Sequence, residues 1–212
     1  MGRYKNMRKK NFIIGIPKAL LYYKYGVLWE TFFTELGFKV VFSKETDNEI
    51  LEWGKKLSID EACLPFKIYL GHVKFLKDKV DYLLVPRIVS LKKGEKLCVN
   101  FYALYDLINN LFDVPILNYN IDREKGQTEY KGFLKMGKEL GCSLKEIKKA
   151  YWKAKEVAMI KQEKDYINQQ NIINNKKEKI LLVSHSYNLY DKLISEPIIR
   201  CLNSLDVDVI YG

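Results

Sequence analysis

Short apolar runs alternate with helical patterns along the first half of the chain. Residues 12–16 form a continuous apolar run that Pro17 ends, which is typical of a parallel strand buried on both faces. Apolar positions at spacings of three and four predict a helix over residues 19–36, and Gly37 suits its carboxyl end. Residues 38–43 then predict a second strand.

The same alternation continues to residue 117. Thr46 and Glu49 fit a capping box that opens a helix ending near Leu57. The next predicted elements are a helix over 64–76, a strand over 80–86, a polar loop over 87–100, a helix over 101–112 and a strand over 115–117. Strands that alternate with helices in this way indicate a parallel, doubly wound sheet with helices on both faces.

The pattern changes after residue 120. Residues 121–175 are typical of helix alone, and Ser143 with Glu146 forms a second capping box there. Strand patterns return over residues 179–184 and 207–211, with a helix over 196–205 between them. Because a sheet of two strands cannot bury both of its faces, we expect this last unit to be incomplete.

The sequence therefore predicts an α/β protein with a Rossmann-like, doubly wound parallel sheet. Its expected parts are a basic arm at 1–11, a first Rossmann-like domain over 12–120, a helical connector over 121–176 and the truncated beginning of a second α/β domain over 177–212. A unit that stops after its second strand either pairs with another copy, giving a homodimer, or leaves a sheet edge exposed.

Composition and charge exclude several classes of protein. Hydrophobic residues make up 48% and charged residues 29% of the 212 positions, a balance that supports a folded core and excludes extensive disorder. No apolar run reaches the ~20 residues that span a bilayer and no signal peptide is evident, so we expect a cytoplasmic protein without a membrane partner. The net charge of +10 favours anionic partners, but without a nucleic-acid-binding motif we do not expect nucleic acid.

Two of the four cysteines lie where this fold binds ligands, beyond the carboxyl ends of the strands. Cys63 stands at the expected start of a helix, where the helix dipole favours a thiolate. Cys98 ends the loop that leaves the strand over 80–86. These two thiols suit part of an iron–sulfur or zinc site, which needs further ligands, or simple packing as small apolar residues. Cys201 fits an apolar helix face, and Cys142 receives no role.

Lys18, Arg87 and His185 are further candidates for ligand contacts. Lys18 follows the first strand, where its ammonium and the helix N–H groups suit a phosphate. Arg87 follows the strand over 80–86, and His185 lies in a polar loop after the strand over 179–184, although turn chemistry also explains His185. His72, inside the helix over 64–76, is expected to be a partly buried histidine whose polar atoms are satisfied. The sequence contains no phosphate loop, dinucleotide fingerprint or nucleophile elbow, so no motif supports ATP hydrolysis.

Five blocks of sequence, in order, resemble one protein family. They are Ile14-Gly15-Ile16-Pro17-Lys18-Ala19-Leu20, Asp60-Glu61-Ala62-Cys63-Leu64-Pro65, Gly71-His72-Val73, the segment from Val80 to Val89 with its Pro86-Arg87-Ile88, and Ser184-His185-Ser186-Tyr187-Asn188-Leu189-Tyr190-Asp191. Together they resemble the acyl-CoA dehydratase activase-related family, which is similar to the iron–sulfur subunits of 2-hydroxyacyl-CoA dehydratases such as 2-hydroxyglutaryl-CoA dehydratase. The match runs from about Phe12 to the last residue.

The resemblance implies two Rossmann-like units that face each other across a cleft, in a protein of strictly anaerobic bacteria. It also implies a cubane-type iron–sulfur cluster, of the 4Fe-4S type or larger. Cys63 and Cys98 match the family's cysteine positions and are the expected metal ligands, while a third thiolate is expected outside these 212 residues, so that the cluster site here is incomplete. Lys18, Arg87 and His185 are the expected contacts to an anion or substrate.

The resemblance also implies partners. In related dehydratases an ATP-hydrolysing activase passes one electron to the cluster, so an ATP-dependent activase and an acyl-CoA are the expected partners. Two functions stay open at this point. The chain is either an electron-relaying component of a 2-hydroxyacyl-CoA dehydratase-like lyase or its activator, or a non-catalytic module that binds an acyl-CoA or the activase and holds no cluster.

Overall fold

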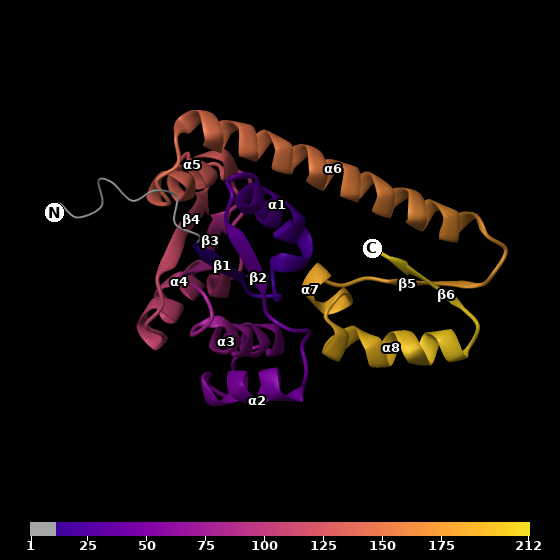
Figure 1. The fold of residues 1–212 in the computed structure, drawn as a ribbon. Helices are drawn as coiled ribbons and strands as arrows, with labels where there is room; N and C mark the ends of the chain where they lie inside the picture. The colour runs from indigo at the N-terminus through magenta and orange to yellow at the C-terminus, as the bar shows by residue number, and fades with distance from the viewer. Residues whose placement is uncertain (1–11) are drawn as a thin grey trace.

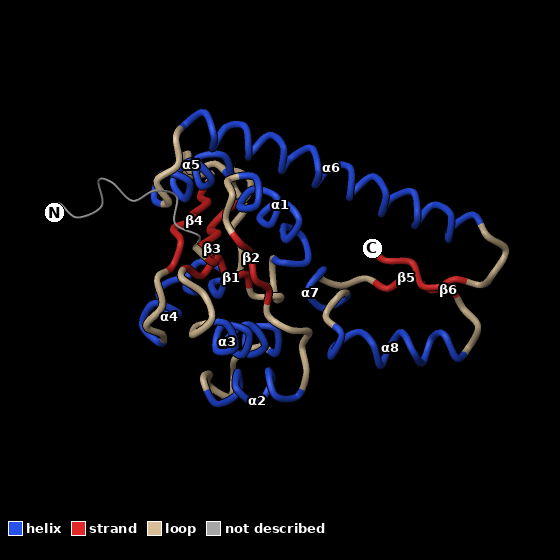
Figure 2. The backbone as a smooth tube through the Cα atoms, in the orientation of Figure 1, coloured by secondary structure: helices blue, strands red, loops and turns tan. Residues whose placement is uncertain are grey.

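A computed structural model describes residues 12–212, so the basic arm predicted for residues 1–11 lies outside the described residues. A parallel sheet of four strands stands between two layers of helices, and a smaller two-stranded sheet lies apart, beside the far end of a long helix (Figures 1 and 2). In chain order the described elements are β1 (Ile13–Ile16), α1 (Tyr22–Glu35), β2 (Lys39–Phe42), α2 (Asn48–Lys56), α3 (Leu64–Leu76), β3 (Tyr82–Ser90), α4 (Val99–Leu111), β4 (Ile116–Asp122), α5 (Glu129–Glu139), α6 (Leu144–Asn174), β5 (Lys179–Leu182), α7 (Ser186–Leu189), α8 (Lys192–Ser204) and β6 (Asp208–Tyr211).

The larger sheet has the strand order β2-β1-β3-β4, and all its neighbouring strands are parallel. The chain therefore builds outward in one direction from β1 to β2 and then returns past β1 to add β3 and β4. This reversal places the topological switch point, where ligands bind in such sheets, between the carboxyl ends of β1 and β3. The arrangement confirms the predicted Rossmann-like, doubly wound α/β fold.

Each face of the larger sheet has its own apolar core. On one face, side chains of β1, β3 and β4 pack against α1, α5 and the first half of α6, and the buried rings of Phe32, Phe33, Phe133 and Tyr119 fill the space between them. On the other face, β3 and β4 pack against α3 and α4, with α2 on the outside of α3 (Figure 1). Apolar side chains that point alternately up and down from the strands supply both cores, as buried parallel strands require.

Strand β3 is longer than the sequence pattern predicts. It continues through Pro86 to Ser90, so the prediction of a loop over residues 87–100 is wrong for its first four positions. Pro86 is tolerated because the N–H of Leu83, three positions earlier, bonds to Pro115 on the β4 side. The nitrogen of Pro86 consequently faces the β1 side, where pairing has already ended at Gly15 and Leu83. Strand β4 is likewise longer than predicted and pairs with β3 as far as Asp122.

Helix α2 begins one residue later than the capping box predicts. The N-cap is Asp47, whose side chain accepts a hydrogen bond of 2.9 Å from the backbone N–H of Ile50. The prediction that Thr46 caps this helix is therefore wrong, because Thr46 is buried and bonds elsewhere. Ser143 and Glu146, by contrast, form the predicted capping box at the start of α6.

The last unit is small and follows the long helix α6. Strands β5 and β6 form a parallel two-stranded sheet, and α8 runs beside it (Figure 1). The predicted division of the chain at residues 120 and 176 stays a prediction; the core shows that α5 and the first half of α6 pack with α1. Within residues 12–212, no helix is long and apolar enough to cross a membrane.

Candidate functional site

Cys63 and Cys98 occupy equivalent positions on two helices that cover the same face of the larger sheet. Cys63 is the N-cap of α3 and Cys98 is the N-cap of α4, and both residues are solvent-exposed. Neither thiol makes a capping hydrogen bond, so each sulfur stays available at the positive end of a helix dipole. An exposed sulfur in this position is accessible to a metal ion or to an electrophile.

The first turn of α4 reaches the N-cap of α3. The side-chain amide of Asn100 lies 3.7 Å from the sulfur of Cys63, with the amide nitrogen as donor. Asn100 belongs to the same first turn that Cys98 caps. The sequence motif gave no reason to connect Asn100 with Cys63, yet this contact is what joins the two helix starts.

Tyr187 of α7 connects the last part of the chain, residues 179–211, with the start of α4. Its ring lies 6.3 Å from the ring of Phe101 in α4, measured between centroids. Burial raises the pKa of the Tyr187 hydroxyl, and the thiols of Cys63 and Cys98 raise that pKa further. Both thiols therefore lie within electrostatic reach of one hydroxyl group, at the point where the two units meet.

His185 joins this group through Tyr187. The two rings stack with centroids 5.0 Å apart and an interplanar angle of 22°. His185 is the N-cap of α7, so the backbone turn that starts this helix also sets the direction of the imidazole. Tyr187 thus stacks on His185 and feels the charges of Cys63 and Cys98, and Asn100 contacts Cys63; the sequence interpretation had singled out neither Tyr187 nor Asn100.

Lys18 and Arg87 lie outside this group and already have acidic partners. The ammonium of Lys18 pairs with Glu45, and the backbone N–H of Lys18 donates to the hydroxyl of Ser43 over 2.8 Å. Arg87 pairs with Asp106 and lies over the ring of Tyr105, with its guanidinium carbon 4.7 Å from the ring centroid. Any anion that reaches either cation has to compete with a carboxylate. Their predicted role as anion or substrate contacts stays a prediction.

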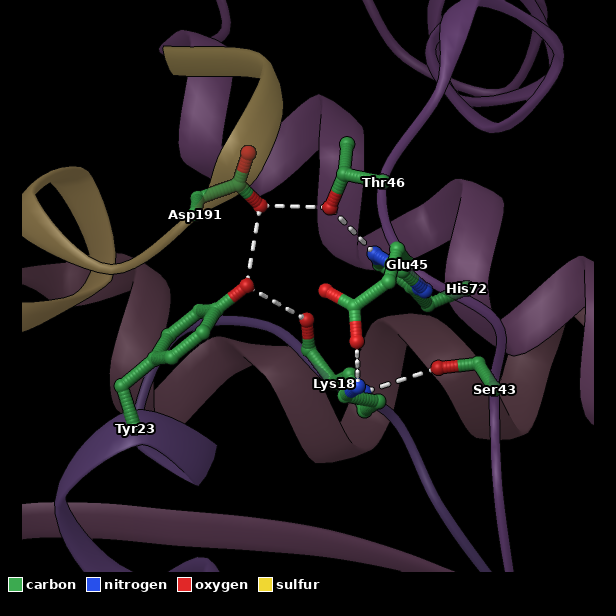
Figure 3. Close-up of polar contacts among 7 residues, drawn as sticks. All are labelled: Lys18, Tyr23, Ser43, Glu45, Thr46, His72 and Asp191. Atoms are coloured by element: carbon green, nitrogen blue, oxygen red, sulfur yellow. Dashed lines mark hydrogen bonds and ion pairs between the residues drawn. The ribbon is translucent and has the colours of Figure 1, made fainter. Parts of the chain in front are cut away.

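A buried polar cluster of Thr46, His72 and Asp191 lies next to Lys18, at the carboxyl ends of β1 and β2 (Figure 3). Asp191, the N-cap of α8, accepts a hydrogen bond from the hydroxyl of Thr46 and lies 3.1 Å from the hydroxyl of Tyr23. The hydroxyl oxygen of Thr46 is in turn 3.0 Å from Nε2 of His72, which is fully buried. The sequence predicted a partly buried His72, whereas the side chain is completely buried and its Nδ1 has no hydrogen-bond partner among the described residues. Sequence reasoning missed Asp191 because an Asp before an amphipathic helix is typical of an ordinary N-cap.

An apolar pocket marks the topological switch point between β1 and β3. Its walls include Pro17, Leu20, Trp29, Pro86 and Phe101, so the pocket shares Phe101 with the site that holds the thiols. Leu20 holds a left-handed backbone conformation, with a φ of 50°, in the turn that forms this wall. Such a conformation is uncommon for leucine and tends to occur at ligand sites.

Cys63 and Cys98 do not by themselves make a complete metal site. Within residues 12–212, no group of three or more His, Cys, Asp or Glu side chains is arranged to hold a metal ion. An iron–sulfur cluster is usually held by four cysteine thiolates, and structural zinc takes four protein ligands. The chemistry of Cys63 and Cys98 fits such a group, but these two thiols supply half of the usual number of ligands.

Comparison with protein families identifies the family of the chain. A family model described as "CoA enzyme activase uncharacterised domain" matches residues 13–212. No curated protein and no solved structure matches the chain.

Proposed function

Because the chain belongs to the family of CoA enzyme activase uncharacterised domains, we propose that it is an iron–sulfur component of an acyl-CoA dehydratase system. In this proposal Cys63 and Cys98 are cluster ligands. The observation that supports it best is that two exposed thiols are N-caps of neighbouring helices, and that Asn100, in the first turn after Cys98, contacts the sulfur of Cys63.

The chain's own residues suit this role in three ways. The starts of α3 and α4 stabilise negative charge on the two sulfurs, as thiolate ligands require. The amide of Asn100 donates toward the sulfur of Cys63, and hydrogen bonds to ligand sulfurs tune the reduction potential of a cluster. Tyr187 and His185 bring aromatic surface from the second unit, and a less solvated site also shifts that potential.

A bound cluster of the 4Fe-4S type supplies one-electron transfer. In the proposal the electron donor is a separate ATP-dependent activase and the system acts on an acyl-CoA. The remaining ligands come from outside residues 12–212, either from another polypeptide segment or from a small thiol.

Anaerobic reconstitution with iron and sulfide tests the proposal. Iron, acid-labile sulfide and the visible absorption spectrum are measured for the unmodified chain and for Cys63→Ser and Cys98→Ser. Cys201→Ser is the matched control, because Cys201 is also exposed but lies on α8. We expect both site variants to lose most of the bound iron and the control to keep it. Equal iron content in all four proteins would contradict the assignment of the ligands.

A second function is that of a module that binds an acyl-CoA and holds no cluster. The cavity bounded by Pro17, Leu20 and Phe101 beside the thiol site has the apolar lining that an acyl chain prefers, but its volume of about 10 Å³ holds about one water molecule, so its walls would have to move apart to admit the chain. Calorimetric titration of the iron-free chain with butyryl-CoA and with free CoA separates the two functions. Tighter binding of butyryl-CoA, together with no iron in the reconstituted chain, would favour the binding module.

A further inference from the structure

The second unit is joined to the first at a buried carboxylate. Asp191 is 1% exposed, and its Oδ1 accepts from the backbone N–H of Leu193 over 3.0 Å at the start of α8. Its Oδ2 accepts from Thr46, in the loop before α2, and lies 3.1 Å from the hydroxyl of Tyr23 in α1. One side chain therefore ties α8 to two separate segments of the first unit (Figure 3).

Thr46 extends this connection to α3. The hydroxyl of Thr46 has one proton, and it donates that proton in the hydrogen bond to Oδ2 of Asp191. The oxygen of Thr46 is then left to accept from Nε2 of His72, 3.0 Å away. His72 lies on α3, the helix that starts directly after Cys63. We call Tyr23, Thr46, His72 and Asp191 the Asp191 network.

The Asp191 network lies close in sequence to the rings at the thiol site. Only Asn188, Leu189 and Tyr190 stand between Tyr187 and Asp191. Leu189 is buried, and the backbone N–H of Tyr190 bonds to the carbonyl of Ser186, so the short segment is held as one compact turn. Fixing Asp191 consequently fixes the positions of His185 and Tyr187.

We propose that Asp191 is a positioning residue that holds the stacked His185 and Tyr187 rings beside Cys63 and Cys98. The functional meaning of this inference rests on the proposed function, since it concerns the same two thiols. The positioning itself is argued from the hydrogen bonds of the Asp191 network and from the contact between Tyr187 and Phe101.

The physical reason is the cost of a buried carboxylate that lacks donors. Removal of the Thr46 or Tyr23 hydroxyl leaves Oδ2 of Asp191 short of a donor, and water is the replacement. A water molecule at Oδ2 needs more room than the hydroxyl it replaces, so we expect the junction of α7 and α8 to shift away from α1. His185 and Tyr187 then move with it, away from the two thiols, which are already solvent-exposed and become still more open to solvent.

Thiol alkylation measures this movement without any cluster. The iron-free chain is treated with iodoacetamide, and the alkylation rate of each cysteine is followed by peptide mass spectrometry. The variants are Thr46→Val and Tyr23→Phe, which remove one hydroxyl each with little change of shape. Tyr22→Phe is the matched control on α1, and Tyr187→Ala is the reference in which the ring itself is removed. Cys201 in each protein reports on general loosening.

We expect Tyr187→Ala to raise the alkylation rates of Cys63 and Cys98 about fivefold, and Thr46→Val and Tyr23→Phe to raise them about threefold. The rate at Cys201 and all rates in Tyr22→Phe should stay unchanged. Combining Thr46→Val with Tyr187→Ala should add nothing to Tyr187→Ala alone, because the ring is already gone.

Unchanged rates at Cys63 and Cys98 in the folded Thr46→Val and Tyr23→Phe proteins would overturn the proposal. An equal rise at Cys201 would also overturn it, since the whole second unit would then have loosened. If one hydroxyl variant does not fold, the other decides the result. Since the measurement uses iron-free protein, failure to bind iron would reject the proposed function and leave this result intact.

Discussion

At the scale of single residues, His72 is an ionisable group that the fold removes from water. The side chain is 0% exposed, and burial lowers the pKa of its imidazole from 6.5 to about 3. The nearby ammonium of Lys18 lowers this pKa further, Asp47 opposes the effect and Lys44 adds to it. The folded protein therefore holds His72 neutral at every pH above this low value.

This neutrality makes the stability of the fold depend on pH. Below pH 6.5 the unfolded chain binds a proton at His72 that the folded chain does not, so stability falls as the pH falls toward 3. At 1.36 kcal/mol per unit, the loss from this group between pH 7 and pH 5 is about 2 kcal/mol. Urea unfolding at both pH values should show that loss in the unmodified chain. In His72→Gln, whose amide can still donate to Thr46, this part of the loss should vanish; an equal loss in both proteins would contradict the prediction.

Single residues also show where prediction of the site from sequence reached its limit. Cys63, Cys98 and His185 could be found because each follows a strand or opens a helix on the side of the sheet that binds ligands. Asn100, Tyr187 and Asp191 could not be found in that way, since their roles depend on contacts between segments far apart in the chain. Local patterns carry no information on such pairings.

At the scale of elements, the crossing of α2 and α3 depends on two glycines. A Cβ atom on Gly71 would lie 1.9 Å from the carbonyl oxygen of Ile50, and one on Gly54 would lie 1.8 Å from the carbonyl oxygen of Lys67. Both obstacles are backbone atoms, so they cannot move without moving a helix. The two helices therefore lie in backbone contact, which places α2 against the outer face of α3.

Gly71→Ala should accordingly destabilise the protein by about 3 kcal/mol, because α2 must shift away from α3 to admit one methyl group. Gly26→Ala on α1 is the matched control, since its Cβ would meet only the ring of Tyr22, at 2.7 Å. Its expected cost is below about 1 kcal/mol, because a ring can turn aside and alanine favours a helix. The midpoints of urea unfolding compare the two variants. Similar losses would show that the helix crossing tolerates a side chain at this position.

Most elements could be predicted from periodicity, and the errors have local physical causes. Strand β3 runs on past Pro86 because the nitrogen of that proline faces the side on which β1 no longer pairs. A residue-by-residue reading treats proline as a stop and cannot know which edge its nitrogen faces. The error at Thr46 is similar, because two adjacent residues both suit an N-cap and tertiary contacts decide between them.

At the scale of the whole molecule, the two sheets differ sharply in how well they are covered. The larger sheet lies between two helical layers, and residues such as Leu83 and Leu84 of β3 are completely buried. Leu181 in the smaller sheet is 60% exposed and Val183, directly after β5, is 70% exposed, and the second half of α6 carries exposed apolar side chains such as Tyr166 and Ile167. Apolar contacts that resist local opening are therefore concentrated in the first unit.

Hydrogen exchange should reveal this difference directly. In dilute solution we expect the amides of β5 and β6 to exchange at least about 100-fold faster than those at Leu83 and Leu84, because opening a two-stranded sheet exposes little buried surface. The measurement by mass spectrometry is repeated at a tenfold higher protein concentration. Slower exchange in β5 and β6 at the higher concentration would show that a second copy covers the sheet, as the homodimer prediction requires. Equal protection of both sheets at the lower concentration would contradict the prediction, since the small sheet would then be stable without any cover.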